Sequence, residues 1–423
     1  MFRSNLFRCV SLICVSVVGA DASAQYQHGY PQMPGVHVPQ SSYQAPILDY
    51  YVGQKPALWD DQQPIEQFVT ALGKRSWFRV DYLHMDFERP GNVFLGAPLL
   101  NVTDPLTVAD ELAGGVTTGV GIIPNLNGMD LADNSGIRGT WGLDLQGAEF
   151  ELEFFGTEQK TDTLSMTNLQ GFRDPLFPSI GTEARPNVVV PLLTNGAPSD
   201  AVSANYLIYD ESYTAELKAK MWGAEAIIVK DSYVPGEGIA WQWLGGFRYV
   251  AFEEELSQLG LFNGGLGAAP STRVSRIRST TSNNMYGPEV GARASIVHRK
   301  FTFSMTPRIA FALNDHTVKT ESGPLTESTA SVADPLRVFS ESHIEFTPVF
   351  ELSFTGEIHV TPNFSIFGGY DFMWMYNVTR PFNNIHYNSV PSAAGSFTPV
   401  VSQTVDLDSF YTKGLSFGCV LRY

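Results

Sequence analysis

From Trp77 to the end of the chain, apolar and polar side chains alternate with a period of two in ten separate stretches. This pattern indicates β-strands with one buried face, because successive side chains of a strand point to opposite sides. The phase slips near Met221 and Trp222, which predicts a β-bulge in the fourth strand. The predicted strands are residues 77–87, 136–145, 148–158, 212–230, 241–253, 286–297, 301–313, 344–360, 364–378 and 410–423.

The connections between these strands alternate strictly between short and long. An up-and-down outer-membrane barrel has this arrangement, with tight periplasmic turns and long extracellular loops. A soluble β-sandwich has no reason to place every long loop at one end. The even strand number puts both ends of the barrel on the side of the short turns. The short connections are residues 146–147, 231–238, 298–300 and 361–363, and the long ones are 88–135, 159–211, 255–284, 315–343 and 379–409.

Composition and strand length favour lipid over water as the surrounding medium. Charged residues are 17% of the chain and aromatic residues 12%, whereas soluble domains carry about 25% charged residues. Too few charges remain to coat a soluble sandwich or lipocalin-like barrel, the alternative that alternation alone leaves open. A strand of about 12 residues, tilted by about 40°, spans about 30 Å of hydrocarbon. We therefore predict an all-β fold, a transmembrane up-and-down antiparallel barrel of about 10 strands, or 12, closed because lipid leaves no partner for an open edge.

The N-terminal 24 residues have the parts of a secretory signal peptide. Arg3 and Arg8 precede an apolar stretch, and the small residues before Gln25 predict cleavage between Ala24 and Gln25. A signal peptide followed by a barrel predicts localisation in the bacterial outer membrane, in contact with outer-membrane lipid.

Residues 25–75 are rich in Pro, Gln and Tyr and lack periodicity until a short helical pattern near their end. They predict a disordered periplasmic tether with a short helix. The predicted domains are therefore a signal peptide at 1–24, the tether at 25–75 and the barrel at 76–423.

The last strand ends on an aromatic residue, Tyr423, with Leu415, Phe417 and Leu421 on the same face. A terminal aromatic on an alternating strand is the feature that the barrel-assembly machinery recognises. We therefore predict that machinery as a partner and this face as lipid-facing.

Four glycine-rich segments stand in the order seen in one family of bacterial outer-membrane porins. They are Trp77–Leu83, Gly136–Asp144, Gly245–Tyr249 and Tyr286–Arg293. From about residue 76 to 423 the chain resembles this family, described as "Putative beta barrel porin-7". The resemblance implies an outer-membrane barrel with porin activity. At Met85-Asp86 the chain departs from the family, which tends to have tryptophan there, and no functional residue is carried over.

The polar faces of the strands predict a charged lumen. Asp144 is expected to face Glu149 across the turn at 146–147, and Arg138 to lie diagonal to Glu153. Glu289 faces Arg308 if residues 297–300 close their hairpin. Acidic residues outnumber basic ones, which predicts a weak cation preference. The lumen candidates are Arg79, Asp81, Arg138, Asp144, Glu149, Glu151, Glu153, Arg248, Glu289, Arg293, Arg308, Glu351 and Glu357.

Two classes of function remain open. The first is a porin-like passive channel for small solutes or ions. The second is a filled structural barrel, or a scaffold that binds a surface partner through its long loops, because small barrels are filled by side chains. The net charge of −16 excludes a general nucleic-acid binder.

No catalytic, metal or cofactor motif occurs in the sequence, so we predict a protein that is not an enzyme and needs no cofactor. Ten-stranded outer-membrane proteases cluster Asp and His at their extracellular rim. The rim candidates here are His84, Asp86, His316 and His343, and they are too few to predict such an activity.

Overall fold

The computed structural model describes residues 73, 75–100, 121–145, 147–167, 187–200, 204–209, 211–233, 238–262, 273–325, 336–391 and 397–422. The predicted signal peptide with its cleavage site at Ala24 and Gln25, the predicted tether helix and Tyr423 lie outside these residues. In the described part of the chain, no helix is long and apolar enough to cross a membrane.

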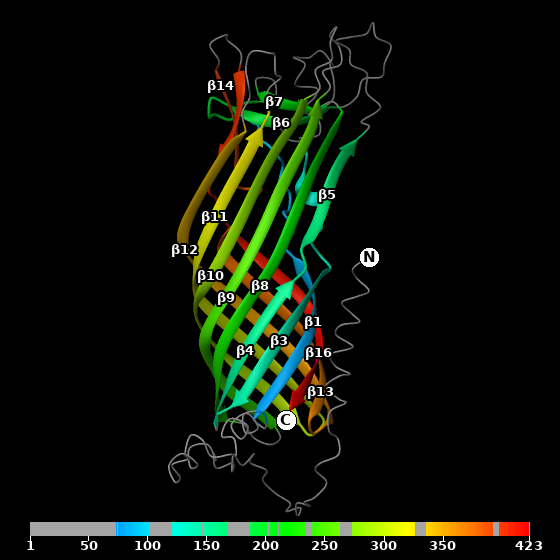
Figure 1. The fold of residues 1–423 in the computed structure, drawn as a ribbon, viewed down its shortest axis with the longest axis vertical. Coiled ribbons are helices and arrows are strands. Elements are labelled where there is room, and N and C mark those ends of the chain that lie inside the picture. Colours follow the sequence, from blue (N-terminus) through cyan, green and yellow to red (C-terminus); the bar gives the residue numbers. More distant parts are fainter. Residues whose placement is uncertain are drawn as a thin grey trace, which may run out of the picture. The chain divides into compact units, whose positions relative to one another are not determined.

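Ten antiparallel strands pair in a closed ring, which confirms the predicted fold class (Figure 1). In chain order, the first of the ten strands pairs with the last, which places Tyr82 opposite Phe417. The third pairs with the fourth, and this pairing closes the circle. Closure leaves every ring strand with two hydrogen-bonded neighbours in the barrel. In ring order the strands are β4 (Ala148–Thr157), β3 (Asn134–Asp144), β1 (Ser76–Phe87), β16 (Leu407–Arg422), β13 (Phe364–Thr379), β12 (Arg337–Thr361), β11 (Phe301–Gly323), β10 (Arg273–His298), β9 (Gly238–Phe262) and β8 (Ser212–Tyr233).

The tight turns lie at one end of the ring, as predicted, with one correction to the register. Asp144 is opposite Glu149, and the Leu145 N–H donates to the Ala148 carbonyl at 2.8 Å, so the turn at 146–147 has two residues. Gly147 takes φ 84°, a left-handed conformation that favours glycine. The β10–β11 turn also has two residues, because His298 pairs with Phe301. The predicted closure over 297–300 was therefore wrong.

Five neighbouring strands, β8 to β12, continue beyond the ring at the other end, as the long ribbons of Figure 1 show. Residues 255–284 and 315–343 were predicted to be loops, yet much of each is strand. We call these continuations the extension and define them as residues 212–221, 252–262, 273–285, 314–323 and 337–345. The remainder of the ring is called the barrel body.

The predicted bulge at Met221 and Trp222 was wrong. The pairing of β8 with β9 is continuous through these residues and shifts only between Asp231 and Tyr233. What changes at Met221 is the kind of side chain that points inward. The inward side chains of the extension, before Met221, are apolar, whereas those of the barrel body, after it, include Glu225. The slip in the sequence pattern therefore marks an exchange of surroundings along a regular strand.

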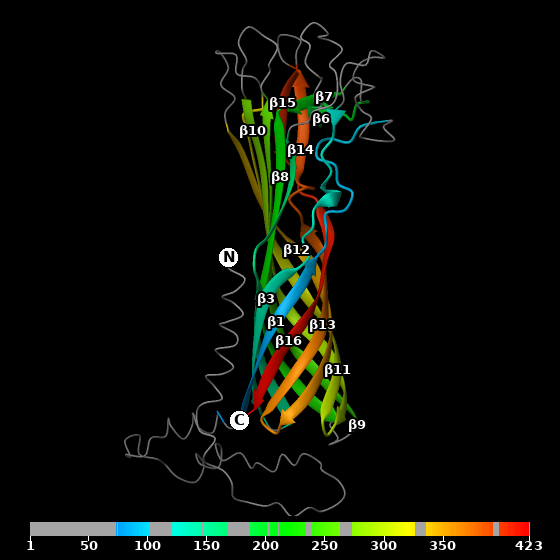
Figure 2. The same ribbon diagram turned by 90° about the vertical axis from the view of Figure 1, so that its right-hand side faces the viewer.

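A second, smaller sheet lies against the inner face of the extension (Figure 2). The Gln258 amide donates to the Tyr387 hydroxyl at 2.7 Å, and the Ser322 hydroxyl donates to the Val401 carbonyl at 3.3 Å, joining the two layers. β5 (Lys160–Thr167) pairs with the upper part of β8. The second sheet contains β15 (Phe397–Gln403), β14 (Ile385–Pro391), β6 (Asn187–Thr194) and β2 (Gly121–Ile122) in that order, with β7 (Asn205–Tyr209) on β6, and the 3-10 turn η2 (Leu126–Gly128) lies beside it in sequence.

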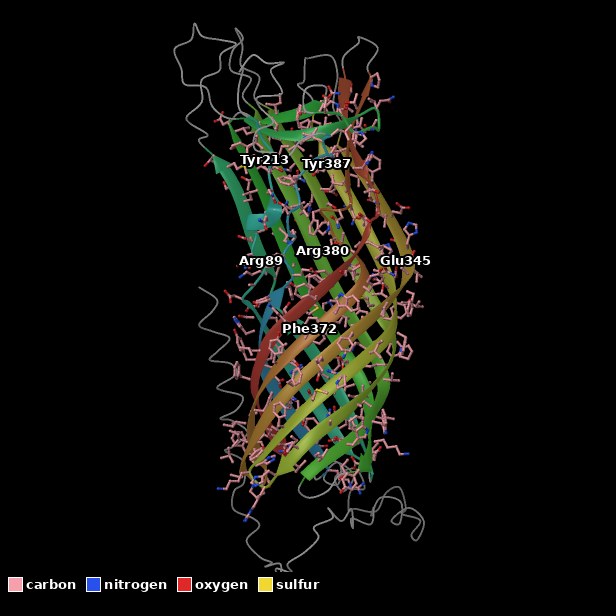
Figure 3. The ribbon with its side chains drawn as sticks, turned by 180° about the vertical axis from the view of Figure 1, so that it is seen from behind. Arg89, Tyr213, Glu345, Phe372, Arg380 and Tyr387 are labelled. Carbon is pink, nitrogen blue, oxygen red and sulfur yellow. The ribbon has the colours of Figure 1, made fainter. Side chains whose placement is uncertain are left out.

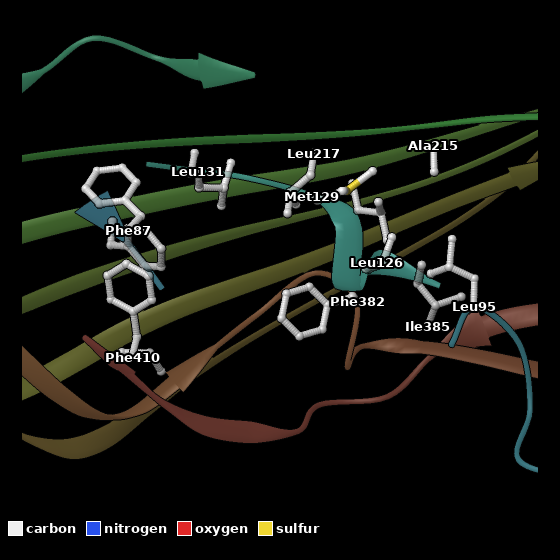
Figure 4. Close-up of a cluster of buried hydrophobic side chains, with 14 of the residues drawn as sticks. Phe87, Leu95, Leu126, Met129, Leu131, Ala215, Leu217, Phe382, Ile385 and Phe410 are labelled. Atoms are coloured by element: carbon white, nitrogen blue, oxygen red, sulfur yellow. The ribbon is translucent and has the colours of Figure 1, made fainter. Parts of the chain in front are cut away.

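A continuous apolar core fills the space between these layers and reaches down into the barrel (Figure 4). At its lower end the Phe252 ring stacks on Phe410 with centroids 4.1 Å apart, and Phe87 meets both rings edge-on. Leu126 and Leu131 pack above them at 0% exposure. Burying side chains of this size stabilises a fold by about 1.5–3 kcal/mol each, so this core anchors the connecting segments inside the sheet.

Candidate functional site

The centre of the barrel body holds five charged side chains from five successive strands, here called the central cluster. β8 contributes Glu225, β9 Arg248, β10 Glu289, β11 Arg308 and β12 Glu351. Each side chain is at most 8% exposed. They meet at one level because Arg248 lies opposite Glu225 and Arg308 opposite Glu351 in the strand register.

Both guanidinium groups of the central cluster bridge several carboxylates. Arg248 lies 2.6 Å from Glu225, 3.0 Å from Glu289 and 2.5 Å from Glu351. Arg308 lies 2.5 Å from Glu225 and 3.5 Å from Glu289, and it also pairs with Glu351. Arg248 donates hydrogen bonds to Glu289, and Arg308 to Glu225 and Glu351. Such charge-assisted hydrogen bonds are short and directional, and the remaining contacts are ion pairs. Two arginines and three glutamates therefore interlock across the lumen.

Glycines opposite the cluster make this packing possible. Gly291 is the partner of Arg308, and a Cβ at Gly291 would lie 2.9 Å from the Arg308 side chain and 2.6 Å from the Pro307 carbonyl oxygen. A larger residue at Gly291 would displace the aliphatic part of the Arg308 side chain.

A second group of charges closes the other side of the lumen at the same level. Asp81 of β1 is fully buried and accepts hydrogen bonds from Arg79 at 2.6 Å and Arg138 at 2.7 Å. Arg138 also lies 3.1 Å from Asp371 of β13. The Arg79 guanidinium stacks over the Phe367 ring at 3.8 Å. Each of these two arginines and two aspartates therefore has a partner of opposite charge.

Below these charges a cavity of about 280 Å³, here called the vestibule, lies toward the tight turns. Glu151 accepts both hydrogen bonds of the Arg293 fork, at 2.9 and 3.1 Å. Glu149 accepts a hydrogen bond from the Trp77 indole, and Glu153 accepts one from Thr140. Three of the predicted lumen carboxylates therefore line one cavity.

Above the charges the lumen narrows to a cavity of about 20 Å³, lined by Leu83, Met85, Phe155 and Met373 together with charged residues of the level below. A cavity of this size holds about one water molecule. Beyond it begins the apolar core of the extension. Along the axis, the described residues thus pass from the vestibule through interlocked charges to the apolar cluster, beside which polar side chains such as Thr281 and Thr320 are also buried.

One buried ion pair ties that core to the barrel wall. Arg380, which follows β13, donates to Glu254 of β9 at 2.8 and 3.0 Å and to the Glu88 carbonyl at 3.1 Å. Its guanidinium lies 5.1 Å above the Phe410 ring. Figure 3 labels Arg380 between Phe372 on the barrel wall and Tyr387 in the second sheet. Burial raises the pKa of Glu88 beside it.

Most of the predicted lumen residues point inward, as the contacts above place them. Glu357 lies at the lower rim of the vestibule, 2.7 Å from Arg422. Asp144 is exposed at the turn end, opposite Glu149 and on the same face of the sheet. Glu289 lies opposite Ala310, so it meets Arg308 diagonally and not face to face.

Sequence reasoning missed three charged lumen residues, Glu225, Asp371 and Arg422. The bulge predicted in β8 obscured the inward phase of Glu225. Asp371 alternates with the outward Tyr370 and Phe372, a signal that was present in the pattern. Arg422 alternates with the outward Leu421 on the last strand.

The last strand presents its apolar face outward over the described residues. Leu415 is 44% and Phe417 53% exposed, and Phe417 pairs with Tyr82 of β1. Leu421 lies opposite Phe78. Tyr423, the predicted recognition residue, lies outside the described residues.

The four rim candidates do not form one site. His84 pairs with Asp133 at 3.3 Å, and Asp86 accepts a hydrogen bond from the Asp133 N–H. His316 and His343 lie on β11 and β12, which are not neighbours of β1 in the ring. Across the described ranges, no three His, Cys, Asp or Glu side chains form a ready metal-binding group.

Comparison with known proteins gives one family and a set of distant folds. The model of a family described as "Putative beta barrel porin-7" matches residues 77–423. No curated protein matches the chain.

Three solved structures are similar over most of their length. The outer membrane protease OmpT from Escherichia coli is 10% identical, with 83% of this chain and 97% of that one covered and a TM-score of 0.41. The Ralstonia pickettii toluene transporter TbuX is 8% identical (84% and 91% covered, TM-score 0.19). A Pseudomonas aeruginosa FadL homologue is 7% identical (82% and 90% covered, TM-score 0.23). Likeness at this level says nothing about activity or substrate.

Proposed function

The chain belongs to the family "Putative beta barrel porin-7", and on that premise we propose that it is a bacterial outer-membrane barrel whose filled lumen serves as a rigid stem for a folded module outside the cell. The observation that carries this proposal is the order of layers along the axis. Above the vestibule come the central cluster, a cavity of about 20 Å³ and the apolar core of the extension. The apolar side chains of this core support a lumen closed to hydrated solutes, because polar groups lose their hydration when they enter apolar surroundings.

The outer face supports a position in lipid. The outward side chains of the barrel body are large and apolar, such as Trp243 and Phe303, which are 55% and 48% exposed. Trp222, Tyr249 and Tyr286 form an aromatic row where the extension begins, as interfacial girdles do. Above that row the outward residues become charged, for example Lys218 and Lys220 of β8.

The extension and the second sheet would therefore stand outside the cell, where the long connections can meet a surface partner. Export through the signal peptide, cleavage between Ala24 and Gln25, and insertion by the barrel-assembly machinery complete the proposal. We expect the mature protein to begin at Gln25, to fractionate with the outer membrane and to shift on a gel when heated. Recovery from the soluble periplasm would contradict it.

A planar-bilayer recording on refolded protein tests the filled lumen. We expect no steady conductance steps from the wild type. We expect none from the variant Glu149→Gln, Glu151→Gln, Glu153→Gln either, although that variant should unfold more easily because Arg293 loses its bidentate partner. Heat-shift gels of the same samples verify folding. Steady ohmic steps from folded wild-type protein would overturn the proposal.

A second candidate is a passive channel with a weak cation preference, favoured by the carboxylate-lined vestibule. This second candidate requires the apolar core, which Arg380 anchors to the barrel wall, to move out of the lumen. Conduction would then give a reversal potential shifted toward cations in a salt gradient, because fixed negative charge raises the local cation concentration. The triple glutamine variant should abolish that shift while conductance persists. This protein would then transport solutes without catalysing a reaction on them.

A further inference from the structure

Two histidines face each other on the inner side of the extension, away from the lumen site. His316 of β11 and His343 of β12 are direct partners in the register, and their ring centroids lie 5.9 Å apart at 40°. This level belongs to the extension, and the outward residues near the pair are the polar Asp315 and Lys319 and the exposed Ile344. Of the eight histidines in the chain, these two have their rings side by side.

His316 is buried without a hydrogen-bond partner. Its residue exposure is 1%, and neither ring nitrogen has a partner among the described residues. The neighbouring Asn314 amide donates to Asn283 at 3.0 Å, whereas the Thr320 hydroxyl on the same inner face also has no partner among the described residues. Buried polar atoms without partners are rare in folded proteins and call for an explanation. Metal binding uses a neutral imidazole nitrogen with a free lone pair, and the two unpartnered ring nitrogens of His316 offer one.

His343, in contrast, is half exposed and already oriented by a carboxylate. Its Nε2 lies 2.7 Å from Glu341 Oε1, and the His343 and Glu341 side chains are 48% and 51% exposed. A histidine bonded through one nitrogen to a carboxylate keeps the other nitrogen free and fixed in direction, as in carboxylate–histidine–zinc arrangements. Glu345 lies one inward position further along the strand, opposite Asn314.

We propose that His316 and His343 bind a divalent first-row ion such as Zn²⁺, with Glu341 orienting His343 or turning to become a third ligand. Zinc–nitrogen bonds of about 2.0–2.1 Å place two imidazole centroids about 5–6 Å apart when both bind one ion. The observed spacing fits this without movement of the strands. Water completes the coordination from the exposed side of β12, because Arg337–Glu345 has no strand on its outer edge among the described residues.

The test uses the folded, full-length mature protein in detergent, titrated with Zn²⁺ by calorimetry and with Co²⁺ by absorption spectroscopy. We expect one ion per chain and a Co²⁺ spectrum with nitrogen ligands. His343→Ala should weaken binding at least tenfold, and Glu341→Gln about tenfold, as loss of an orienting carboxylate does. His316→Ala should abolish the site.

His84→Ala is the matched control, because His84 also sits beside a carboxylate, Asp133 at 3.3 Å, but faces no second histidine. It should leave affinity unchanged. His343 is exposed, so its variant should keep the heat-shift of the folded barrel even if His316→Ala does not. Binding that is absent from the wild type, or equally tight in the wild type and His343→Ala, would overturn the proposal.

Discussion

The five strands β8 to β12 run through both the barrel body and the extension, and their apolar and polar faces are exchanged between the two regions. On β8, Trp222 and Ile228 point outward in the body while Glu225 points inward. A few residues higher, Glu216 and Lys218 point outward and Leu217 inward. The backbone runs through this exchange without a break in register. A single hydrogen-bonded ladder therefore supports both arrangements.

This contrast indicates that the medium outside the sheet, and not the strand itself, decides which face of the strand is apolar. Lipid around the barrel body accepts apolar side chains, and the charges turn inward, where they must pair with each other. Water around the extension reverses both preferences, and an ordinary apolar core forms inside. The reversal also underlies the proposed closure of the lumen, because the apolar core of the extension continues down to Phe252 and Phe410.

The largest effect should come from breaking the interior of the barrel body. Arg248→Met leaves Glu225, Glu289 and Glu351 with Arg308 as their remaining partner in the central cluster. Removing one member of a buried ion network costs about 3–5 kcal/mol. We expect a loss near the top of that range, measured as a lower urea midpoint of the heat-modifiable form. Arg278→Met, which removes a half-exposed arginine paired with Glu255 on the extension, should cost under about 1 kcal/mol.

The interior of the extension should respond as a soluble core does. Phe252→Ala removes a ring that is 0% exposed and stacked on Phe410, with an expected loss of about 4 kcal/mol. Phe247→Ala, five positions away on the outward face of the body, should cost clearly less, because lipid replaces the lost contacts. Similar unfolding midpoints for the two variants would mean that the two regions do not differ in this way.

The outer faces can be compared with a single charge. Ile228→Arg places a cation on the outward face of the barrel body, where Ile228 is 51% exposed, and should cost about 2–4 kcal/mol if that position is near the bilayer midplane. Glu216→Arg, on the same strand and face in the extension, should stay within about 1 kcal/mol. Folding yield into lipid vesicles measures both. Equal yields would argue against a lipid boundary between these positions.

The smallest effect concerns the junction of the two regions, where Glu88 lies. Burial raises the pKa of Glu88 above its usual value of about 4.5. A raised pKa contributes stability below the unfolded value, and that stability is lost as pH rises through the folded value. Glu88→Gln should remove this dependence and slightly stabilise the protein at neutral pH, by less than about 1 kcal/mol. Unfolding midpoints between pH 4 and 8 would reveal it, and parallel pH curves for both proteins would contradict the assignment.

Much of the barrel body was predictable from the sequence because its alternation is strong. All ten ring strands coincide with predicted ones, and the inward positions of Arg138, Glu151 and Arg308 follow from the period of two. The extension was not predictable in the same way. Its β10 segment has small polar residues on both faces, such as Ser279 and Thr280, so no face stands out as apolar. A segment rich in Ser, Thr and Asn has the composition of a loop. Its buried face is identified only by the second sheet that covers it in the folded structure.

The ring, its strand order and most of the charges that enter the lumen follow from alternation in the sequence, because the side-chain period of a strand is two and lipid tolerates no open edge. The partners of those charges are visible only in the folded barrel. Arg248 and Arg308 reach carboxylates on strands up to three positions apart in the ring, and the segment after β13 folds back through Arg380 to meet Glu254. Such contacts depend on barrel curvature and on chain segments far apart in sequence, and no local pattern encodes them.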